Sequence, residues 1–198
     1  MEKLIVILGP TASGKTSLSV KIAHKYSGEI ISADSRQIYK GMDIGTGKDL
    51  QEYIIQNKSI PFHLIDILEP IKDYSVFQFK NDFHKIFKKL NKNKKLPILC
   101  GGTALYIDSV LFNYDMSGTK PNKQLRKKLE KLSIEELNDQ LDKIDKNKNK
   151  KYLDDTKRRI IRSIEISSST QSKKSINRVI DNPLVLGIKV ERKNLLLK

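Results

Sequence analysis

The stretch that decides the fold is LIVILGPTASGKT, residues 4–16. It opens with an apolar run, Leu4 to Leu8, of the kind that forms a fully buried strand in a parallel sheet. It continues as G-x-x-x-x-G-K-[ST], the glycine-rich phosphate-binding loop. A helix is predicted over 15–26 because apolar residues recur there at helical spacing. The motif therefore stands between a strand and a helix, which is the context that its chemistry requires.

Each part of this loop has a physical reason to hold phosphate groups. Glycines let the backbone curl so that successive N–H groups point at phosphate oxygens, and the helix N-terminus adds a partial positive charge. Lys15 supplies a point charge and Thr16 offers a hydroxyl group to Mg²⁺. A glycine turn that merely joins strand to helix is the alternative. The residues expected to bind a diphosphate or nucleotide are Gly9, Pro10, Thr11, Ala12, Ser13, Gly14, Lys15 and Thr16.

Further patterns continue the alternation of strands and helices. The predicted strands are 29–33, 63–67, 96–100 and 184–190. An amphipathic helix is predicted over 76–90. Such units build parallel sheets flanked by helices, and their ligands bind at the carboxyl ends of the strands. We therefore expect an α/β, P-loop NTPase-like core at residues 1–113, to which the chain returns at 176–198.

The composition changes beyond Phe112. Residues 124–150 form a charged, helical pattern with a sparse stripe of leucines, and a second helix is predicted over 155–167. Residues 167–175 are polar and are expected to form a loop. We therefore expect a small helical insert at residues 114–175.

The net charge of +15 lies entirely in the second half of the chain. Residues 1–84 carry 10 basic and 10 acidic side chains, whereas residues 85–198 carry 28 and 13. A half of this kind suits a polyanionic partner. The alternative is that lysine is simply the default surface residue of a chain rich in Lys, Asn and Ile.

Targeting and redox features are few. The single cysteine, Cys100, predicts no internal disulfide bond, and no secretory signal pattern opens the sequence. No apolar run approaches the roughly 18 residues that a membrane span needs. We expect a cytoplasmic protein without membrane contact.

Asp34 follows the predicted strand 29–33. At a strand end its carboxylate could coordinate Mg²⁺ or accept a proton from an incoming nucleophile. It could equally cap the N-terminus of a helix.

Five blocks of the sequence resemble the tRNA dimethylallyltransferases (tRNA isopentenyltransferases) in the same order. The blocks are GPTASGKT (9–16), ISADSRQIYKGMDIGT (31–46), PFHLID (61–66), YSV (74–76) and GGTALY (101–106). The resemblance is close over residues 3–112 and thinner through Arg126 and 158–165. Gly47 and Ala104 depart from the residues more usual in these blocks.

That family transfers a dimethylallyl group from dimethylallyl diphosphate to the exocyclic N6 amine of the adenosine 3′ of the anticodon in tRNA, releasing pyrophosphate. The resemblance implies that tRNA and dimethylallyl diphosphate are the partners and that Mg²⁺ is the cofactor, with Thr16 as its ligand. We also expect a monomer. It assigns catalysis to Asp34 as general base, with Lys15 and Thr16. No phosphoryl group moves in this reaction.

The resemblance also assigns contacts with tRNA. The residues are Asp34, Ser35, Arg36, Gln37, Thr103, Arg126, Arg158, Arg159, Ile160, Ile161 and Arg162. Independently of the family, Arg158 and Arg162 share one face of a predicted helix at i and i+4 and could meet backbone phosphates. An ordinary solvated face is the alternative.

The family ordinarily continues past residue 198 into helices with a further arginine-rich segment, so the resemblance implies a chain without the usual C-terminal part. Three other functions stay open. They are a prenyltransferase acting on free adenine nucleotide, a small-molecule P-loop kinase, and a non-catalytic RNA-binding remnant.

Overall fold

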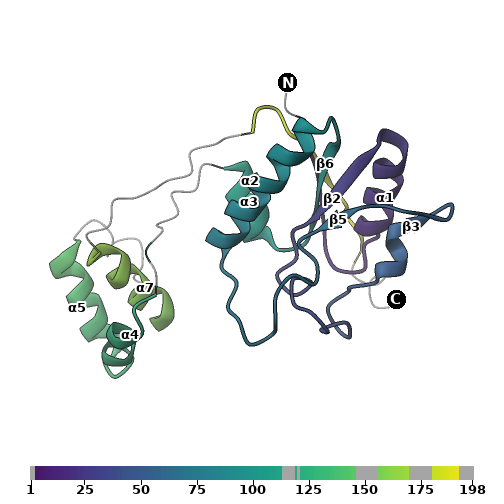
Figure 1. The fold of residues 1–198 in the computed structure, drawn as a ribbon. Helices are drawn as coiled ribbons and strands as arrows, with labels where there is room; N and C mark the ends of the chain where they lie inside the picture. Colours follow the sequence, from purple (N-terminus) through teal and green to yellow (C-terminus); the bar gives the residue numbers. More distant parts are fainter. Residues whose placement is uncertain (1–2, 113–118, 120, 146–155, 170–179, 192–198) are drawn as a thin grey trace. The chain divides into compact units, whose positions relative to one another are not determined.

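The computed structural model describes residues 3–112, 119, 121–145, 156–169 and 180–191. The chain divides into two compact units (Figure 1). Unit 1 comprises Met1–Tyr114 and Asn177–Lys198, and unit 2 comprises Asp115–Ile176, where the sequence led us to expect boundaries at 113 and 175. In the described ranges, no helix has the length and apolar character that crossing a membrane requires.

A parallel sheet forms the centre of unit 1, as expected. Within the described part of the chain its strands are β1 (Ile5–Leu8), β2 (Gly28–Ser32), β5 (Phe62–His63), β6 (Leu96–Gly101) and β7 (Leu184–Gly187). They run in the order β5-β2-β6-β1-β7, and every pairing is parallel. Because β2, β6 and β1 are neighbours, the loops that follow them emerge side by side at one edge of the sheet.

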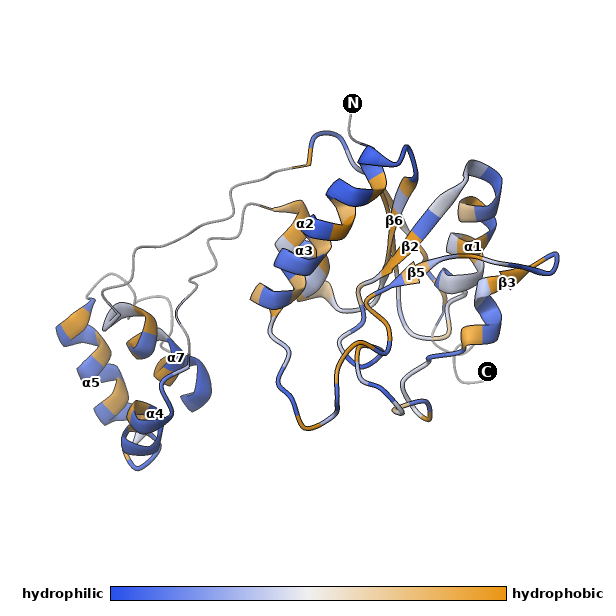
Figure 2. Cartoon of the chain, in the orientation of Figure 1, coloured by the Kyte–Doolittle hydropathy of each residue, from blue (hydrophilic) through white to orange (hydrophobic). Residues whose placement is uncertain are grey.

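Helices cover both faces of this sheet (Figure 1). α1 (Lys15–Tyr26) packs on one face, where Ile30 joins its buried residues, and the neighbouring Ile31 faces the other way. There it meets α2 (Val76–Lys92) and α3 (Ala104–Leu111). Figure 2 shows the orange of apolar residues along much of β6 and along part of β2.

The second face is held mainly by aromatic side chains of α2. Phe79, Phe83 and Phe87 recur at helical spacing and are completely buried. Burying a side chain of this size stabilises the fold by about 1.5–3 kcal/mol. The helix starts at a capping box in which Ser75 and Gln78 bond to each other's backbone N–H groups.

The structure corrects one sequence expectation for unit 1 and adds one helix that was not expected. The strand expected over 63–67 is wrong beyond His63, because Leu64 and Asp66 adopt positive φ angles of 62° and 53°. The chain there bonds to the loop after β2 instead, and Ile67 N–H donates to Ile38 O at 3.0 Å. Helix α3 had no counterpart among the expected elements.

Smaller elements complete unit 1. A 3₁₀ helix η1 (Leu50–Tyr53) precedes a short hairpin of β3 (Ile54–Ile55) and β4 (Lys58–Ser59). β2 ends at Ser32 and β7 ends at Gly187, so both strands are shorter than expected at their carboxyl ends.

Unit 2 is a small helical module, described by α4 (Lys123–Leu129), α5 (Ile134–Ile144) and α7 (Lys157–Ser167). The helix expected over 124–150 is wrong as one element, because Ser133 starts α5 with a capping box to Glu136. Its last part, 146–150, and most of the expected loop 167–175 lie outside the described residues. The buried core is Leu129, Leu137, Leu141, Ile160, Ile161 and Ile164.

Candidate functional site

A cleft of about 460 Å³ opens at the sheet edge where the loops after β1, β2 and β6 meet. One wall is the phosphate-binding loop with the start of α1. The other walls include Asp34, Gln37 and the segment 45–49. The structure thus gathers six of the eight expected phosphate-binding residues, Thr11 to Thr16, and two residues of the loop after β2, Asp34 and Gln37, around one cavity.

The phosphate-binding loop has the backbone that its glycines permit. Gly14 lies at φ 85° as the N-cap of α1, a conformation that costs a side-chain-bearing residue energy. A Cβ atom at Gly9 would lie 2.8 Å from Ile188 O, so the loop also needs glycine where it passes the segment after β7. Gly14 is therefore required for its positive φ angle, and Gly9 is required because there is no room for a side chain.

Two side chains of the loop suit an anionic ligand. Burial lowers the pKa of Lys15, although Asp34 and Glu52 nearby oppose this effect. Its ammonium group donates to Pro10 O, within the loop itself. Ser13 Oγ is buried, and no group of the described ranges forms a hydrogen bond with it. Phosphate oxygens would satisfy both groups, because they accept hydrogen bonds and bring negative charge.

The loops after β2 and β6 are locked together. Ser35 N–H donates to Thr103 Oγ1 at 3.0 Å, and Thr103 N–H donates to Ala33 O at 3.1 Å. This contact is possible only because residue 101 is glycine, since a Cβ there would lie 2.2 Å from Ala33 O. Thr103 precedes α3 but makes no side-chain cap, because its hydroxyl group is used on Ser35.

Asp34 caps a turn rather than a helix. Its Oδ1 accepts from Arg36 N–H at 2.9 Å, and no helix starts at residues 35–38. Within the described chain, Oδ2 has no hydrogen-bond partner, and the side chain lines the cleft. The carboxylate is therefore fixed through one oxygen and available through the other.

The cleft has a further wall that the sequence pattern did not identify. Gln37 accepts from Ser32 Oγ at 3.0 Å and donates to Gly47 O at 3.1 Å, so it ties the segment 45–49 to the end of β2. Ser32 and Gln37 lie in the family-like block 31–46, but no short-range pattern predicts that Gln37 bonds to Gly47.

Lys48 holds the same segment from inside. Its side chain is 1% exposed, and the ammonium group contacts Asp43 at 2.7 Å, Asp66 and Tyr39 O. Although burial lowers it, the pKa of Lys48 is raised above its ordinary value because the hydrogen bonds and charges of the two carboxylates prevail. Asp66 takes its positive φ in the stretch where the expected strand fails, so the same distortion brings it to Lys48.

The oxygen donors that could hold Mg²⁺ here are few. Thr16 and Asp34 both line the cleft, and in the described ranges no group of three or more His, Cys, Asp or Glu side chains is arranged to hold a metal. This donor set fits Mg²⁺, which keeps several waters and takes much of its coordination from substrate phosphates.

Charge in unit 2 is segregated by helix. α5 carries four acidic residues, Glu135, Glu136, Asp139 and Asp142, and one basic residue, Lys143. α4 and α7 carry eight basic residues against the single acid Glu165. A composition that merely favours lysine would spread the basic excess over all three helices, so its concentration on α4 and α7 favours a polyanionic ligand. The basic residues are Lys123, Arg126, Lys127, Lys128, Lys157, Arg158, Arg159 and Arg162.

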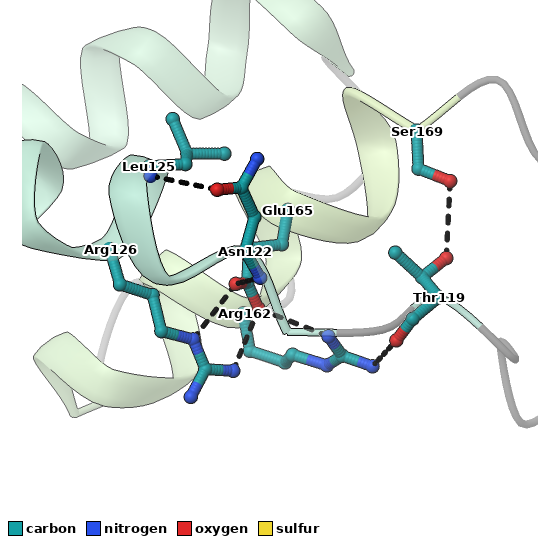
Figure 3. A network of polar contacts seen from close by, with 7 residues as sticks. All are labelled: Thr119, Asn122, Leu125, Arg126, Arg162, Glu165 and Ser169. Carbon is teal, nitrogen blue, oxygen red and sulfur yellow. Dashed lines mark hydrogen bonds and ion pairs between the residues drawn. The ribbon is translucent and has the colours of Figure 1, made fainter.

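The residues expected to contact tRNA in unit 2 fall into different environments. Arg158 and Arg159 are exposed on α7. Arg126 and Arg162 are about one-third exposed and both bond to Glu165 (Figure 3). The side chains of Ile160 and Ile161 are buried at 0% and 5% exposure and pack in the core of unit 2, and their contact with tRNA stays a prediction.

Comparison with known proteins identifies the family. The sequence model described as IPP transferase matches residues 37–196. This chain belongs to the IPP transferase family. Its relatives include tRNA dimethylallyltransferase 1 of Azobacteroides pseudotrichonymphae, which is 49% identical over 193 residues, covering 96% of this chain and 63% of the relative.

Solved structures agree with this assignment. A tRNA isopentenylpyrophosphate transferase from Staphylococcus epidermidis superposes with a TM-score of 0.62 at 38% identity, covering 100% of this chain and 66% of that one. A eukaryotic dimethylallyltransferase, described as acting on tRNA, superposes at 0.83 with 27% identity, covering 100% and 50%. The fold is thus P-loop NTPase-like, and this IPP transferase chain spans less than two-thirds of the curated relative's length.

Proposed function

We propose that this IPP transferase chain moves a dimethylallyl group from dimethylallyl diphosphate to the N6 amine of the adenosine 3′ of the anticodon in tRNA. The observation that carries the proposal is the shared cleft, in which a phosphate-binding loop faces a carboxylate with one unbonded oxygen. A diphosphate leaving group and a proton acceptor are the two things that prenylation of an amine needs.

In the proposed reaction the carbon–oxygen bond of dimethylallyl diphosphate breaks and a carbon–nitrogen bond forms at N6. The electron pair leaves on pyrophosphate, where Lys15 and the loop N–H groups stabilise the developing charge. The proton of the attacking amine passes to Asp34, and a positioned base of this kind contributes about 10²–10⁴ in rate. Arg36 N–H, bonded to the other carboxylate oxygen, keeps Asp34 oriented.

Thr16, which lines the cleft, would hold Mg²⁺ together with the diphosphate oxygens. When bound, the ion would supply positive charge to the leaving group.

The tRNA side of the proposal rests on two groups of residues. Ser35, Arg36, Gln37 and Thr103 stand next to Asp34, where an adenine base swung out of its stack would be received. The exposed Arg158 and Arg159, with the lysines of α4, would meet backbone phosphates. We further propose that the protein works in the cytoplasm, where its substrate tRNA would be found, and as a monomer.

The deciding experiment incubates the protein with dimethylallyl diphosphate, Mg²⁺ and unmodified tRNA, followed by mass analysis of the nucleosides. We expect prenylated adenosine. A parallel reaction with AMP selects the free-nucleotide alternative if only AMP is prenylated, and loss of ATP γ-phosphate to a small molecule selects the kinase. Tight tRNA binding without any product would select the non-catalytic alternative.

A further inference from the structure

One buried carboxylate, that of Glu165, pairs with an arginine from each of the two basic helices of unit 2, α4 and α7. The side chain of Glu165 is 1% exposed, and it is the only acidic residue on α4 and α7. Its Oε1 accepts from Asn122 N–H and from Arg126 Nε, both at 2.8 Å (Figure 3). Its Oε2 accepts from Arg126 Nη2 at 2.8 Å and from Arg162 Nη1 at 3.0 Å.

These bonds fix the orientation of both arginines. Arg126 is paired through two nitrogens, and such bidentate pairing sets the plane of the guanidinium group. Arg162 is held at both ends of its fork, because Nη2 donates to Thr119 O at 2.7 Å. A flexible arginine on a surface would lose side-chain entropy on binding a phosphate, and these two have already lost it.

The arrangement also concentrates like charges. Both guanidinium groups reach the same oxygen of Glu165, although they come from different helices. Each arginine remains about one-third exposed while the carboxylate lies inside. Two guanidinium groups held on one carboxylate leave a net positive charge at this place, which would attract an anion.

We propose that Glu165 is a positioning residue for RNA binding, which orients Arg126 and Arg162 toward backbone phosphates of the RNA. This inference rests on the proposed function for the class of ligand. It extends that function by assigning a role to an acidic residue in a basic surface.

The pKa of Glu165 supports this arrangement. Although burial raises it, hydrogen bonds from Arg126, Arg162 and Asn122 lower the pKa to about 2. The carboxylate is therefore ionised at any pH at which RNA binding is measured.

The test compares two variants that remove the same negative charge. Glu165→Gln removes it from the network, and Asp139→Asn removes it from the exposed side of α5. Diffuse electrostatics predicts that both variants bind RNA slightly more tightly, since both become more positive. Positioning predicts that Glu165→Gln binds an unmodified anticodon stem-loop about five- to tenfold more weakly, while Asp139→Asn does not. Equal or tighter binding by Glu165→Gln would overturn the proposal.

A second arm separates positioning from a role in folding alone. In an Arg126→Ala, Arg162→Ala background, Glu165→Gln should cause no further loss of RNA affinity, at a temperature where circular dichroism shows each variant folded. The same loss in that background would mean that Glu165 acts only through the fold. If Glu165→Gln does not fold, Glu165→Asp keeps the charge with a shorter reach, and it should weaken RNA binding only while Arg126 and Arg162 are present.

The readouts keep this proposal apart from the proposed reaction. A wild-type protein that binds RNA in a Glu165-dependent way but yields no prenylated adenosine would contradict the reaction and leave the positioning role standing. A wild-type protein that prenylates tRNA with no dependence of affinity on Glu165 would do the reverse. No measurable RNA binding by the wild type would overturn the positioning role.

Discussion

The two units offer positive charge to their proposed anions in different ways. In unit 1 the loop of residues 9–16 presents backbone N–H groups from a buried strand and a helix start, with one lysine added. In unit 2 the positive charge is carried by side chains on short helices. Two of these side chains, Arg126 and Arg162, form hydrogen bonds with Glu165. A backbone site keeps its shape when single side chains change, whereas a side-chain site depends on each of its members.

The largest effect is expected from a substitution in unit 1 that removes the proton acceptor of the cleft but keeps the shape of the side chain. Asp34→Asn should lower the single-turnover rate of tRNA prenylation by about 10²–10⁴, since the amide cannot take the proton, while tRNA affinity is kept. Glu52→Gln, which removes the same charge from another wall of the cleft, is the matched control. Turnover of Asp34→Asn near that of the control would reduce Asp34 to a residue that holds the turn at Arg36.

The next largest effect is expected at the charge of the loop. Lys15→Ala should weaken binding of dimethylallyl diphosphate by about 10- to 100-fold, because hydrogen bonds to a charged group are worth about 1.5–3 kcal/mol. Isothermal titration with the diphosphate measures it, and RNA affinity should stay unchanged. Unaltered diphosphate affinity would mean that the backbone alone binds the ligand, or that the ligand binds elsewhere.

A moderate effect is expected at Lys48, because the position of the segment 45–49 in unit 1 depends on this side chain. Lys48→Met leaves Asp43 and Asp66 without their shared cation and should lower the free energy of unfolding by about 1–3 kcal/mol, because both carboxylates are partly solvated. Loosening the segment 45–49 should also raise KM for the diphosphate several-fold. Lys48→Arg should restore part of both quantities, and a KM equal to the wild type in Lys48→Met would separate this segment from binding.

Smaller effects are expected from the exposed arginines of unit 2. Arg158→Ala and Arg159→Ala should each lower the slope of log affinity against log salt by somewhat under about one unit, with dimethylallyl diphosphate binding intact. Alanine at Lys92, Lys94 and Lys95, exposed at the end of α2 and after it, is the control. Equal losses from both sets would show diffuse attraction, and no loss from either would contradict an RNA surface on α7.

The last prediction concerns the dependence of stability on pH. The arginines stabilise the ionised form of Glu165, so its contribution to stability is complete above its ordinary pKa of 4.5 and is lost as the pH falls toward about 2. The difference in Tm between wild type and Glu165→Gln should therefore shrink across this interval. A constant difference down to pH 2 would show that Glu165 contributes through packing rather than charge.

Much of the fold followed from local pattern. The helix 15–26 was located to the residue, and strands 4–8 and 96–100 to within one residue at either end. Their signals are short-range, because an apolar run, a glycine or a repeat at helical spacing acts within one element. The break before α5 was also readable in principle, since Ser133 and Glu136 have the spacing of a capping box.

The candidate site divides in the same way. The phosphate-binding loop could be recognised because all its groups lie in one stretch of eight residues. The joins to Thr103 and Lys48 could not, because Ser35 and Thr103 are 68 positions apart and Lys48 and Asp66 are 18 apart. Glu165 did leave a signal, since it falls four residues after the buried Ile161 on an otherwise apolar face of its helix, where a charge needs a partner.

By itself the sequence determined that this chain has an α/β core with a phosphate-binding loop, since hydrophobic period and glycine placement specify those elements locally. Only the tertiary structure decided which side chains work together. Gly101 allows the close approach to Ala33 by which the loops after β2 and β6 bond to each other. Of the eight basic side chains on α4 and α7, Arg126 and Arg162 are the two that bond to Glu165. Such choices depend on contacts between distant residues, because burial makes each unpaired charge or clashing atom costly only once the chain is packed.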